Sequence, residues 1–282
     1  MFQYLRPTRL EEVGELLAAH QGSAALLAGG TDLLVALRSG KGFPEVLIDL
    51  KRVADLGADI SAGDSSIRIG ALTVLADVER SSLVRDRFPA LARAAGVVGS
   101  IQIRNRATLA GNICNASPAA DTAPPLLAYG AAIQLFGLQG SRTLPISEFF
   151  LGYRSTALEP GEIVVSIEVP YPPPGCGSSF QRITRRRGVD LATVSAACLL
   201  QPHQETLFGM GAVGPTPLRV RDDTGILSDP AGDPQQGREA IARLAGRASP
   251  ISDLRSGKEY RAAMLQVVLL RAYEESLRMC LN

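Results

Sequence analysis

The sequence of 282 residues contains no tryptophan, and only 5% of its residues are aromatic. Proteins that hold single-stranded nucleic acids stack the bases on aromatic side chains, so this scarcity argues against such a surface. Neither sign of charge is in excess, since 29 Lys and Arg stand against 28 Asp and Glu. The chain therefore lacks the electrostatic footprint for binding nucleic acid or coating an anionic membrane. Any anion that it binds must be held by local groups.

Cysteine and histidine are scarce as well, which limits the kinds of site that the chain can build. The four cysteines are scattered: Cys114, Cys176, Cys198 and Cys280. They form no C-x-x-C unit, so a zinc or iron–sulfur site made by this chain alone is not expected. His20 is predicted to end a helix and His203 to lie in a turn, without the partners of a triad or metal site. We predict no catalytic and no metal-binding residues.

Long apolar runs are also missing. No stretch approaches the roughly 20 uncharged apolar residues that a membrane helix requires. Residues 1–7 lack the basic region and apolar core of a signal peptide. The composition, 46% hydrophobic and 20% charged, is that of a soluble globular protein long enough for two domains. We therefore predict a cytoplasmic protein without a membrane span.

Helical and strand patterns alternate in the first half of the chain. The spacing of Leu10, Val13 and Leu17 predicts an amphipathic helix, introduced by a capping box of Thr8 and Glu11. Strands are expected over 24–28, 46–50 and 66–70. Helices are expected over 33–37, 74–79 and 90–95.

A boundary is predicted at prolines 172–174, which cannot lie inside a helix or a central strand. Beyond it, strands are expected near 180–184, 192–200 and 206–213. A closing helix from about 259 to 281 should pack on the sheet that these strands form. The fold class that we predict is α+β, with residues 171–282 forming a smaller α+β domain of antiparallel sheet and helices.

Residues 102–130 differ from their surroundings because Asn, Ser, Thr, Pro and Gly interrupt an otherwise apolar stretch. This composition predicts an ordered, irregular loop whose backbone amides point toward a ligand.

Two glycine-bearing loops could supply such amides. The first, Gly29-Gly30-Thr31-Asp32, follows a predicted strand, and glycine there would let bare amides approach a diphosphate. The second, at 108–112, has the same ingredients. If both loops met in one cleft they would suit a dinucleotide, with Asp121 free to accept from a ribose or ribityl hydroxyl. Neither loop is a Rossmann or Walker motif, and an ordinary turn is the alternative for the first loop.

These segments together resemble the FAD-binding medium subunit of molybdenum hydroxylases, a family that includes xanthine dehydrogenase, carbon monoxide dehydrogenase and 4-hydroxybenzoyl-CoA reductase. The resemblance rests on 26–33, 102–105, 107–115 and 117–121. Further similar segments lie at 69–73, 148–150, 160–163, 187–192, 214–219 and 251–255. The resemblance implies an FAD-binding domain of the p-cresol methylhydroxylase type over 1–170, in two parts with a break near 55. Residues 171–282 would form the C-terminal domain of the molybdenum-hydroxylase flavoprotein type.

The resemblance also implies which residues hold FAD. In the family the first loop cradles the diphosphate, the second holds the other side of the cofactor, and the acid at Asp121 contacts it. Arg182 stands where relatives often carry Lys beside the flavin, and Ala110 stands where many have glycine. The implied cofactor-binding residues are Leu26, Leu27, Ala28, Gly29, Gly30, Thr31, Asp32, Leu33, Val98, Thr108, Leu109, Ala110, Gly111, Asn112, Asp121, Val164 and Arg182. Val98 and Val164 rest on spacing alone.

Three of the singled-out residues have simpler interpretations. Arg182, together with 185–187, could form a solvated strand face, or a rim that docks an acidic partner subunit. Asp32 could simply cap the helix that follows it. Cys114 is more simply a small buried residue than a redox group.

The function that the resemblance implies is electron transfer within a larger complex. An iron–sulfur small subunit with [2Fe–2S] clusters would carry electrons from a molybdopterin large subunit to the FAD of this chain. The final acceptor would be NAD⁺, oxygen or another molecule, and relatives suggest a dimer of heterotrimers. Two alternatives are a self-contained flavin oxidase or reductase, which would need its own substrate site, and a flavin-free accessory protein.

Overall fold

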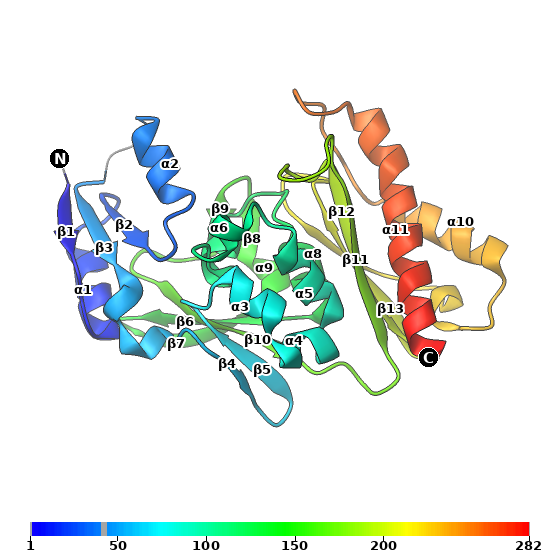
Figure 1. The fold of residues 1–282 in the computed structure, drawn as a ribbon, viewed down its shortest axis with the longest axis horizontal. Helices are drawn as coiled ribbons and strands as arrows, with labels where there is room; N and C mark the ends of the chain where they lie inside the picture. Colours follow the sequence, from blue (N-terminus) through cyan, green and yellow to red (C-terminus); the bar gives the residue numbers. More distant parts are fainter. Residues whose placement is uncertain (1, 41–43, 282) are drawn as a thin grey trace.

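The computed structural model describes residues 2–40 and 44–281, which form three main sheets in succession along the chain (Figure 1). The fold is α+β, as the sequence predicts, and the C-terminal sheet is antiparallel. Among the described residues no helix is long and apolar enough to cross a bilayer. The predicted division at 170–171, with a break near 55, stays a prediction.

The N-terminal sheet is parallel, with strand order β1–β3–β2. Its strands are β1 (Gln3–Leu5), β2 (Ala24–Leu27) and β3 (Val46–Asp49). Its helices are α1 (Leu10–Ala19) and α2 (Leu33–Arg38), followed by the 3₁₀ turns η1 (Leu50–Arg52) and η2 (Ala54–Leu56). The strands and helices expected here are confirmed. The first glycine loop connects β2 to α2, so a strand holds one of its ends and a helix the other.

The capping box predicted for α1 is wrong. Arg9, not Thr8, occupies the N-cap, and no side chain caps the helix there. The helix begins at Leu10, one residue later than the predicted capping box requires, and Leu10 and Val13 are buried in the core. The carboxylate that reaches back therefore belongs to Glu12, whose Oε2 accepts from the amide of Thr8 at 2.9 Å.

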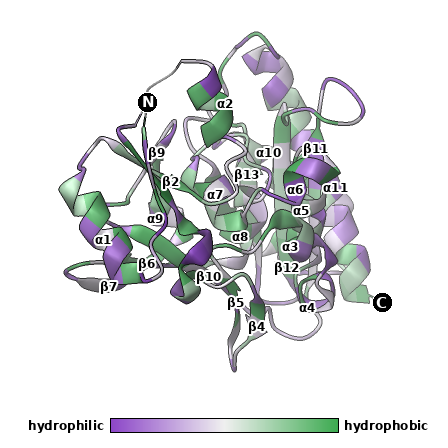
Figure 2. Cartoon of the chain, turned by 60° about the vertical axis from the view of Figure 1, so that its left-hand side comes forward, coloured by the Kyte–Doolittle hydropathy of each residue, from purple (hydrophilic) through white to green (hydrophobic). Residues whose placement is uncertain are grey.

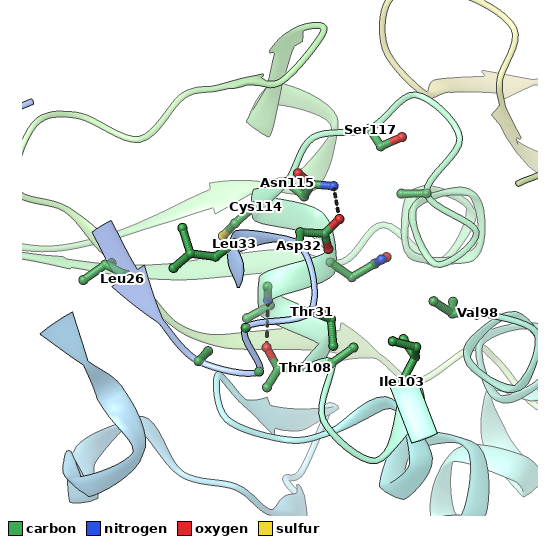
Figure 3. Close-up of a pocket in the computed structure, with 18 of the residues that line it drawn as sticks. Leu26, Thr31, Asp32, Leu33, Val98, Ile103, Thr108, Cys114, Asn115 and Ser117 are labelled. Carbon is green, nitrogen blue, oxygen red and sulfur yellow. Dashed lines mark hydrogen bonds between the residues drawn. The ribbon is translucent and has the colours of Figure 1, made fainter. Parts of the chain in front are cut away.

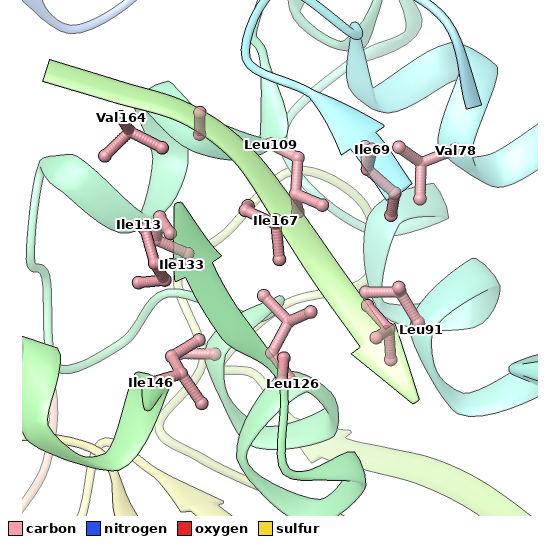
Figure 4. Packing of buried hydrophobic residues seen from close by; sticks show 14 of the residues in the cluster. Ile69, Val78, Leu91, Leu109, Ile113, Leu126, Ile133, Ile146, Val164 and Ile167 are labelled. Atoms are coloured by element: carbon pink, nitrogen blue, oxygen red, sulfur yellow. The ribbon is translucent and has the colours of Figure 1, made fainter. Parts of the chain in front are cut away.

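The central sheet has strand order β4–β5–β10–β6–β7 and is antiparallel. Its strands are β4 (Ile60–Ala62), β5 (Ser66–Gly70), β6 (Ala132–Gly137), β7 (Gly140–Pro145) and β10 (Ile163–Pro170). The helices beside it are α3 (Leu75–Arg80), α4 (Ser82–Arg87), α5 (Pro89–Gly96) and α9 (Ile146–Phe149). A small hairpin of β8 (Phe150–Gly152) and β9 (Ser155–Thr156) precedes β10. Figure 4 shows β10 and β6 burying Ile167 and Ile133 against Leu91 and Leu126.

The irregular loop predicted over 102–130 is partly wrong, because this segment forms three short helices. They are α6 (Ile101–Arg104), α7 (Leu109–Cys114) and α8 (Ala123–Tyr129). Residues that suggested a loop stand at helix starts: Thr108 caps α7, and prolines occupy the first turn of α8. Ser100, just before this segment, caps α6. In Figure 2, α7 and α8 carry mainly hydrophobic residues, as expected of helices packed between sheets.

The C-terminal sheet is the middle layer of the second half. Its strands follow each other in space as β11 (Gly177–Ile183), β12 (Val194–Gln201), β13 (Glu205–Gly211) and β14 (Leu218–Arg221). One face packs on α10 (Pro234–Ala245) and α11 (Lys258–Leu281), beside the turn η3 (Ile226–Ser228). The other face joins the core of the first half, so alternate residues of β12, such as Cys198 and Leu199, belong to different cores.

Gly209 allows this sheet to approach α8 closely. A Cβ on Gly209 would lie 1.9 Å from the backbone oxygen of Pro124. We predict that Gly209→Ala lowers the free energy of unfolding by about 3 kcal/mol or more, at the upper end of overpacking costs. The matched change Gly237→Ala, inside α10 with its Cβ 3.7 Å from Leu227, should raise it by about 0.5–1 kcal/mol. Urea unfolding measures both, and equal stabilities would contradict the packing.

Candidate functional site

A cavity of about 770 Å³ lies between the first glycine loop, the second glycine loop and the start of β10 (Figure 3). The turn between β11 and β12 closes one part of it. Its walls come from segments far apart in the sequence, at 26–39, 98–121, 154–164 and 190–191, with Leu50 and Ala71 between them. The two loops singled out from the sequence therefore share one cavity.

The first loop is shaped by its two glycines. A Cβ on Gly29 would lie 2.1 Å from the carbonyl oxygen of Arg106, and Gly30 has φ +75°. Among the residues that the structure describes, no group accepts a hydrogen bond from the amides of Gly29, Gly30, Thr31 or Asp32. Successive amides without acceptors around a left-handed glycine are typical of the backbone arrangements that bind phosphate.

Hydrogen bonds within the second loop and to neighbouring residues hold it in place. The Thr108 hydroxyl accepts from the amide of Gly111 at 3.0 Å and so caps α7 (Figure 3). The amide of Leu109 donates to the Thr73 carbonyl at 3.1 Å, which fixes the loop to the neighbouring backbone. Asn112 Oδ1 accepts from the hydroxyl of Thr122 at 2.6 Å. This bond orients the side chain of Asn112, which lines the cavity and whose amide nitrogen donates to no acceptor among the described residues.

A side-chain bond joins the two loops. Asn115 Nδ2 donates to Asp32 Oδ1 at 3.2 Å (Figure 3). The interpretation of Asp32 as a simple helix cap is wrong, because it occupies the N-cap of α2 but its side chain bonds no amide there. Its backbone at ψ −46° is already helical, which turns the carboxylate away from the first turn.

Asp121 is the buried acid of the cavity. Its side chain is 6% exposed, and Arg182 Nη1 donates to its Oδ2 at 2.7 Å. Its other oxygen, Oδ1, is buried without a hydrogen-bond partner among the described residues. Burial raises the pKa of Asp121 to about 7, although the charge and hydrogen bond of Arg182 act in the opposite direction. A ligand that donates a hydrogen bond to Oδ1 would satisfy this orphaned acceptor.

Arg182 does not lie on a solvated strand face, so that interpretation is wrong for this residue. Its side chain is 14% exposed and stands behind Asp121, outside the cavity lining. It also donates to the backbone oxygen of Asp190 at 3.5 Å. Residues 185–187, in the turn that follows β11, are exposed, as the interpretation of a solvated face requires.

Most of the residues singled out from the sequence meet at the cavity wall. Leu27 and Leu109 do not line it, because their side chains are buried among other hydrophobic residues. Arg182 does not line the cavity either, because it stands behind its partner Asp121. Cys114 is half-buried at the wall, and burial raises the pKa of its thiol to about 12, which makes it a poor nucleophile.

Sequence reasoning missed part of the wall. Helical spacing from Asp32 could have indicated Val35, Ala36 and Ser39 of α2. Other wall residues lie in segments that carry the family resemblance but were not named individually: Ala71, Ile103, Ala107, Asn115, Ser117, Ala119, Ala120, Glu162, Ile163, Asp190 and Leu191. Leu50, Gly99, Arg154 and Leu158 lie outside those segments, and the folding of distant parts of the chain brings them to the cavity.

Comparison with known proteins gives the cavity a context. Residues 1–172 match the family profile of the FAD binding domain in molybdopterin dehydrogenase. Residues 179–276 match that of the CO dehydrogenase flavoprotein C-terminal domain.

Curated relatives cover nearly the whole chain. The carbon monoxide dehydrogenase medium chain of Hydrogenophaga pseudoflava is 33% identical over 99% of this chain and 98% of its own length. The xanthine dehydrogenase FAD-binding subunit of Escherichia coli O157:H7 is 32% identical over 97% of this chain and 95% of its own.

Solved structures agree with these sequence matches. The carbon monoxide dehydrogenase of Hydrogenophaga pseudoflava has a chain that superposes with a TM-score of 0.93 at 33% identity, covering 99% of this chain and 98% of that one. Quinoline 2-oxidoreductase from Pseudomonas putida 86 gives 0.91 at 26% identity, covering 100% and 99%.

The raised pKa of Asp121 has a consequence for stability. Between about pH 4 and pH 7 the folded chain keeps a proton on this carboxyl that the unfolded chain has released. Rising pH therefore removes stability across that window, by at most about 4 kcal/mol at about 1.4 kcal/mol per pKa unit. We expect the stability of the wild type to fall relative to that of Asp121→Asn as the pH rises from about 4 to 8 in urea unfolding without ligand. A difference that is the same at both pH values would contradict the assignment.

Proposed function

The chain belongs to the family of FAD-binding subunits of molybdenum hydroxylase complexes, and on that premise we propose that it is the electron-transfer subunit of such a complex. It would receive electrons from iron–sulfur centres on a partner chain and deliver them to NAD⁺ or another acceptor. Bound FAD supplies the redox chemistry, which the side chains at this cavity cannot provide. The complex would act in the cytoplasm.

The fit of the cavity to a dinucleotide carries this proposal. Four amides without acceptors, at 29–32, would hold the diphosphate. Asp121 Oδ1 would accept from a hydroxyl of the cofactor, and Asn112 would donate through its amide nitrogen. The site thus offers donors where the ligand is anionic and an acceptor where it carries hydroxyl groups.

The remaining predicted residues would position the cofactor and exclude water. Val98 and Val164 line the cavity as apolar groups, and Leu26, Ala28, Leu33 and Ala110 add to the same wall. Thr108 and Gly111 keep the second loop in place through their mutual hydrogen bond. Arg182 would hold the carboxylate of Asp121 in its orientation and supply positive charge behind it.

The partners that we propose are an iron–sulfur small subunit and a molybdopterin large subunit. The relatives are named as medium chains or subunits, so each is part of a larger assembly. The scattered cysteines of this chain supply no cluster ligands, so the [2Fe–2S] clusters and the molybdopterin cofactor would reside on those partners. A dimer of heterotrimers is the assembly that we propose.

The close approach of the loops gives a test of FAD binding. Gly29→Ala would place a Cβ against the Arg106 carbonyl and force the loops apart, so we expect at least about a tenfold loss of FAD affinity, or about 1.4 kcal/mol. Gly152→Ala is the matched control, since its Cβ would meet nothing closer than 3.8 Å and it lies outside the cavity. Quenching of flavin fluorescence on titration measures both. Equal affinities would contradict the placement of FAD between the loops.

Electron transfer is tested on the isolated chain loaded with FAD. We expect no oxidation of carbon monoxide or xanthine and no oxygen uptake with either, because in the proposed complex an organic substrate would react on the molybdopterin subunit. After chemical reduction, its flavin absorbance should return when NAD⁺ is added if NAD⁺ is the acceptor. Turnover of an organic donor by this chain alone would instead support a self-contained oxidase. Failure to take up FAD even with partner chains present would support the accessory protein.

A further inference from the structure

The charges at the cavity wall are mostly negative, although its proposed ligand is an anion. Five charged side chains line the cavity within the described chain: Asp32, Asp121, Arg154, Glu162 and Asp190. Arg154 is the one cation among them. A diphosphate with two negative charges therefore enters a wall that carries four carboxyl groups.

Three of the four acids are compensated by arginines that stand behind the wall. The pairs are Asp121 with Arg182 at 2.7 Å, Glu162 with Arg142 at 2.6 Å and Asp190 with Arg185 at 3.2 Å. These arginines do not line the cavity, and each already has a carboxylate partner. They are consequently not available as the direct counter-charge of a ligand.

Arg154 has no such partner. Within the described residues no carboxylate lies within 4.0 Å of its guanidinium, whose recorded contact is the ring of the adjacent Tyr153 at 5.7 Å. It lies in the turn between β8 and β9 at φ +55°, a conformation that favours glycine. A charged, strained and unpaired residue at a cavity wall is a candidate for ligand binding.

Hydrogen bonds link the turn that carries Arg154 to the first loop. The amide of Arg154 donates to the carbonyl of Ala116 at 3.0 Å, and Ala116 is itself at φ +44°. Asn115, which precedes Ala116, donates to the side chain of Asp32, the last of the four residues at 29–32 whose amides lack acceptors. Two hydrogen bonds therefore connect the turn that carries Arg154 with the loop that would hold the diphosphate.

We propose that the guanidinium of Arg154 pairs with the diphosphate of FAD and is its main positive counter-charge. This assignment rests on the proposed function. The amides at 29–32 supply partial positive charge and shape, whereas a guanidinium supplies a full charge and a planar pair of donors that matches phosphate oxygens. The anion is thereby neutralised locally in a chain whose formal net charge is only +1.

The test compares two arginine variants by titration of the chain with FAD. Arg154→Gln should weaken FAD binding about tenfold and flatten the dependence of its affinity on salt concentration. Arg187→Gln is the matched control, because Arg187 is exposed and without an ion pair among the described residues, as Arg154 is, but does not line the cavity. It removes the same charge and should change the affinity less than twofold.

Two further variants separate charge from backbone strain. Arg154→Lys keeps the charge and should recover part of the affinity and of the salt dependence. Arg154→Gly relieves the positive φ, so it should raise the thermal midpoint of the FAD-free chain while it weakens FAD binding. A merely structural role for Arg154 would move stability and affinity in the same direction.

The outcomes distinguish this assignment from the proposed function. If the wild type takes up no FAD, the proposed function fails. If the wild type takes up FAD and Arg154→Gln binds it equally tightly with the same salt dependence, the assignment of Arg154 alone is overturned. Equal losses in Arg154→Gln and Arg187→Gln would also overturn it, because they would indicate a long-range field rather than a contact.

Discussion

The close approach of Gly29 to the carbonyl of Arg106 is the constraint on which the cavity depends. No side chain fits between them, since a Cβ would lie 2.1 Å from that oxygen. Because the backbones meet there, two loops distant in sequence become opposite walls of one cavity, and the bond from Asn115 to Asp32 joins them a second time. The left-handed Gly30 then leaves successive amides without internal acceptors. A glycine that looks like part of an ordinary turn thus sets the geometry of the site.

The C-terminal sheet contributes to the same site through the side chain of Arg182 and through Asp190 and Leu191, which line the cavity from the turn between β11 and β12. Arg182 belongs to β11, yet its partner Asp121 precedes α8 in the first half of the chain. The close contact of Gly209 with Pro124 seats the sheet against α8 and so keeps this ion pair in register. Burial and the arginine act in opposite directions on the Asp121 carboxyl, which leaves its pKa near neutrality. The second half of the chain is therefore part of the wall of the cofactor site.

Local patterns in the sequence predicted β2 and β3 of the N-terminal sheet, β5 of the central sheet, three strands of the C-terminal sheet and the two glycine loops of the cavity. Strand-then-glycine order indicated the first loop, and motif resemblance supplied Asp121. Sequence reasoning failed where tertiary packing decides. Residues 102–130 looked like a loop, since capping residues and prolines are equally typical of turns and of helix starts. Leu109 belongs to a site motif but faces the core. Arg154 gave no signal, because it reaches the cavity through a contact with Ala116 that only the fold creates.

The central claim is that one dinucleotide lies across both loops, and a crystal structure of the chain grown with FAD tests it most directly. The account predicts density for the diphosphate within hydrogen-bonding distance of the amides at 29–32, with a cofactor hydroxyl on Asp121 Oδ1. It also predicts that the loops keep their positions, since their contacts exist without ligand. Density for FAD outside this cavity, or a diphosphate that touches neither loop, would contradict it.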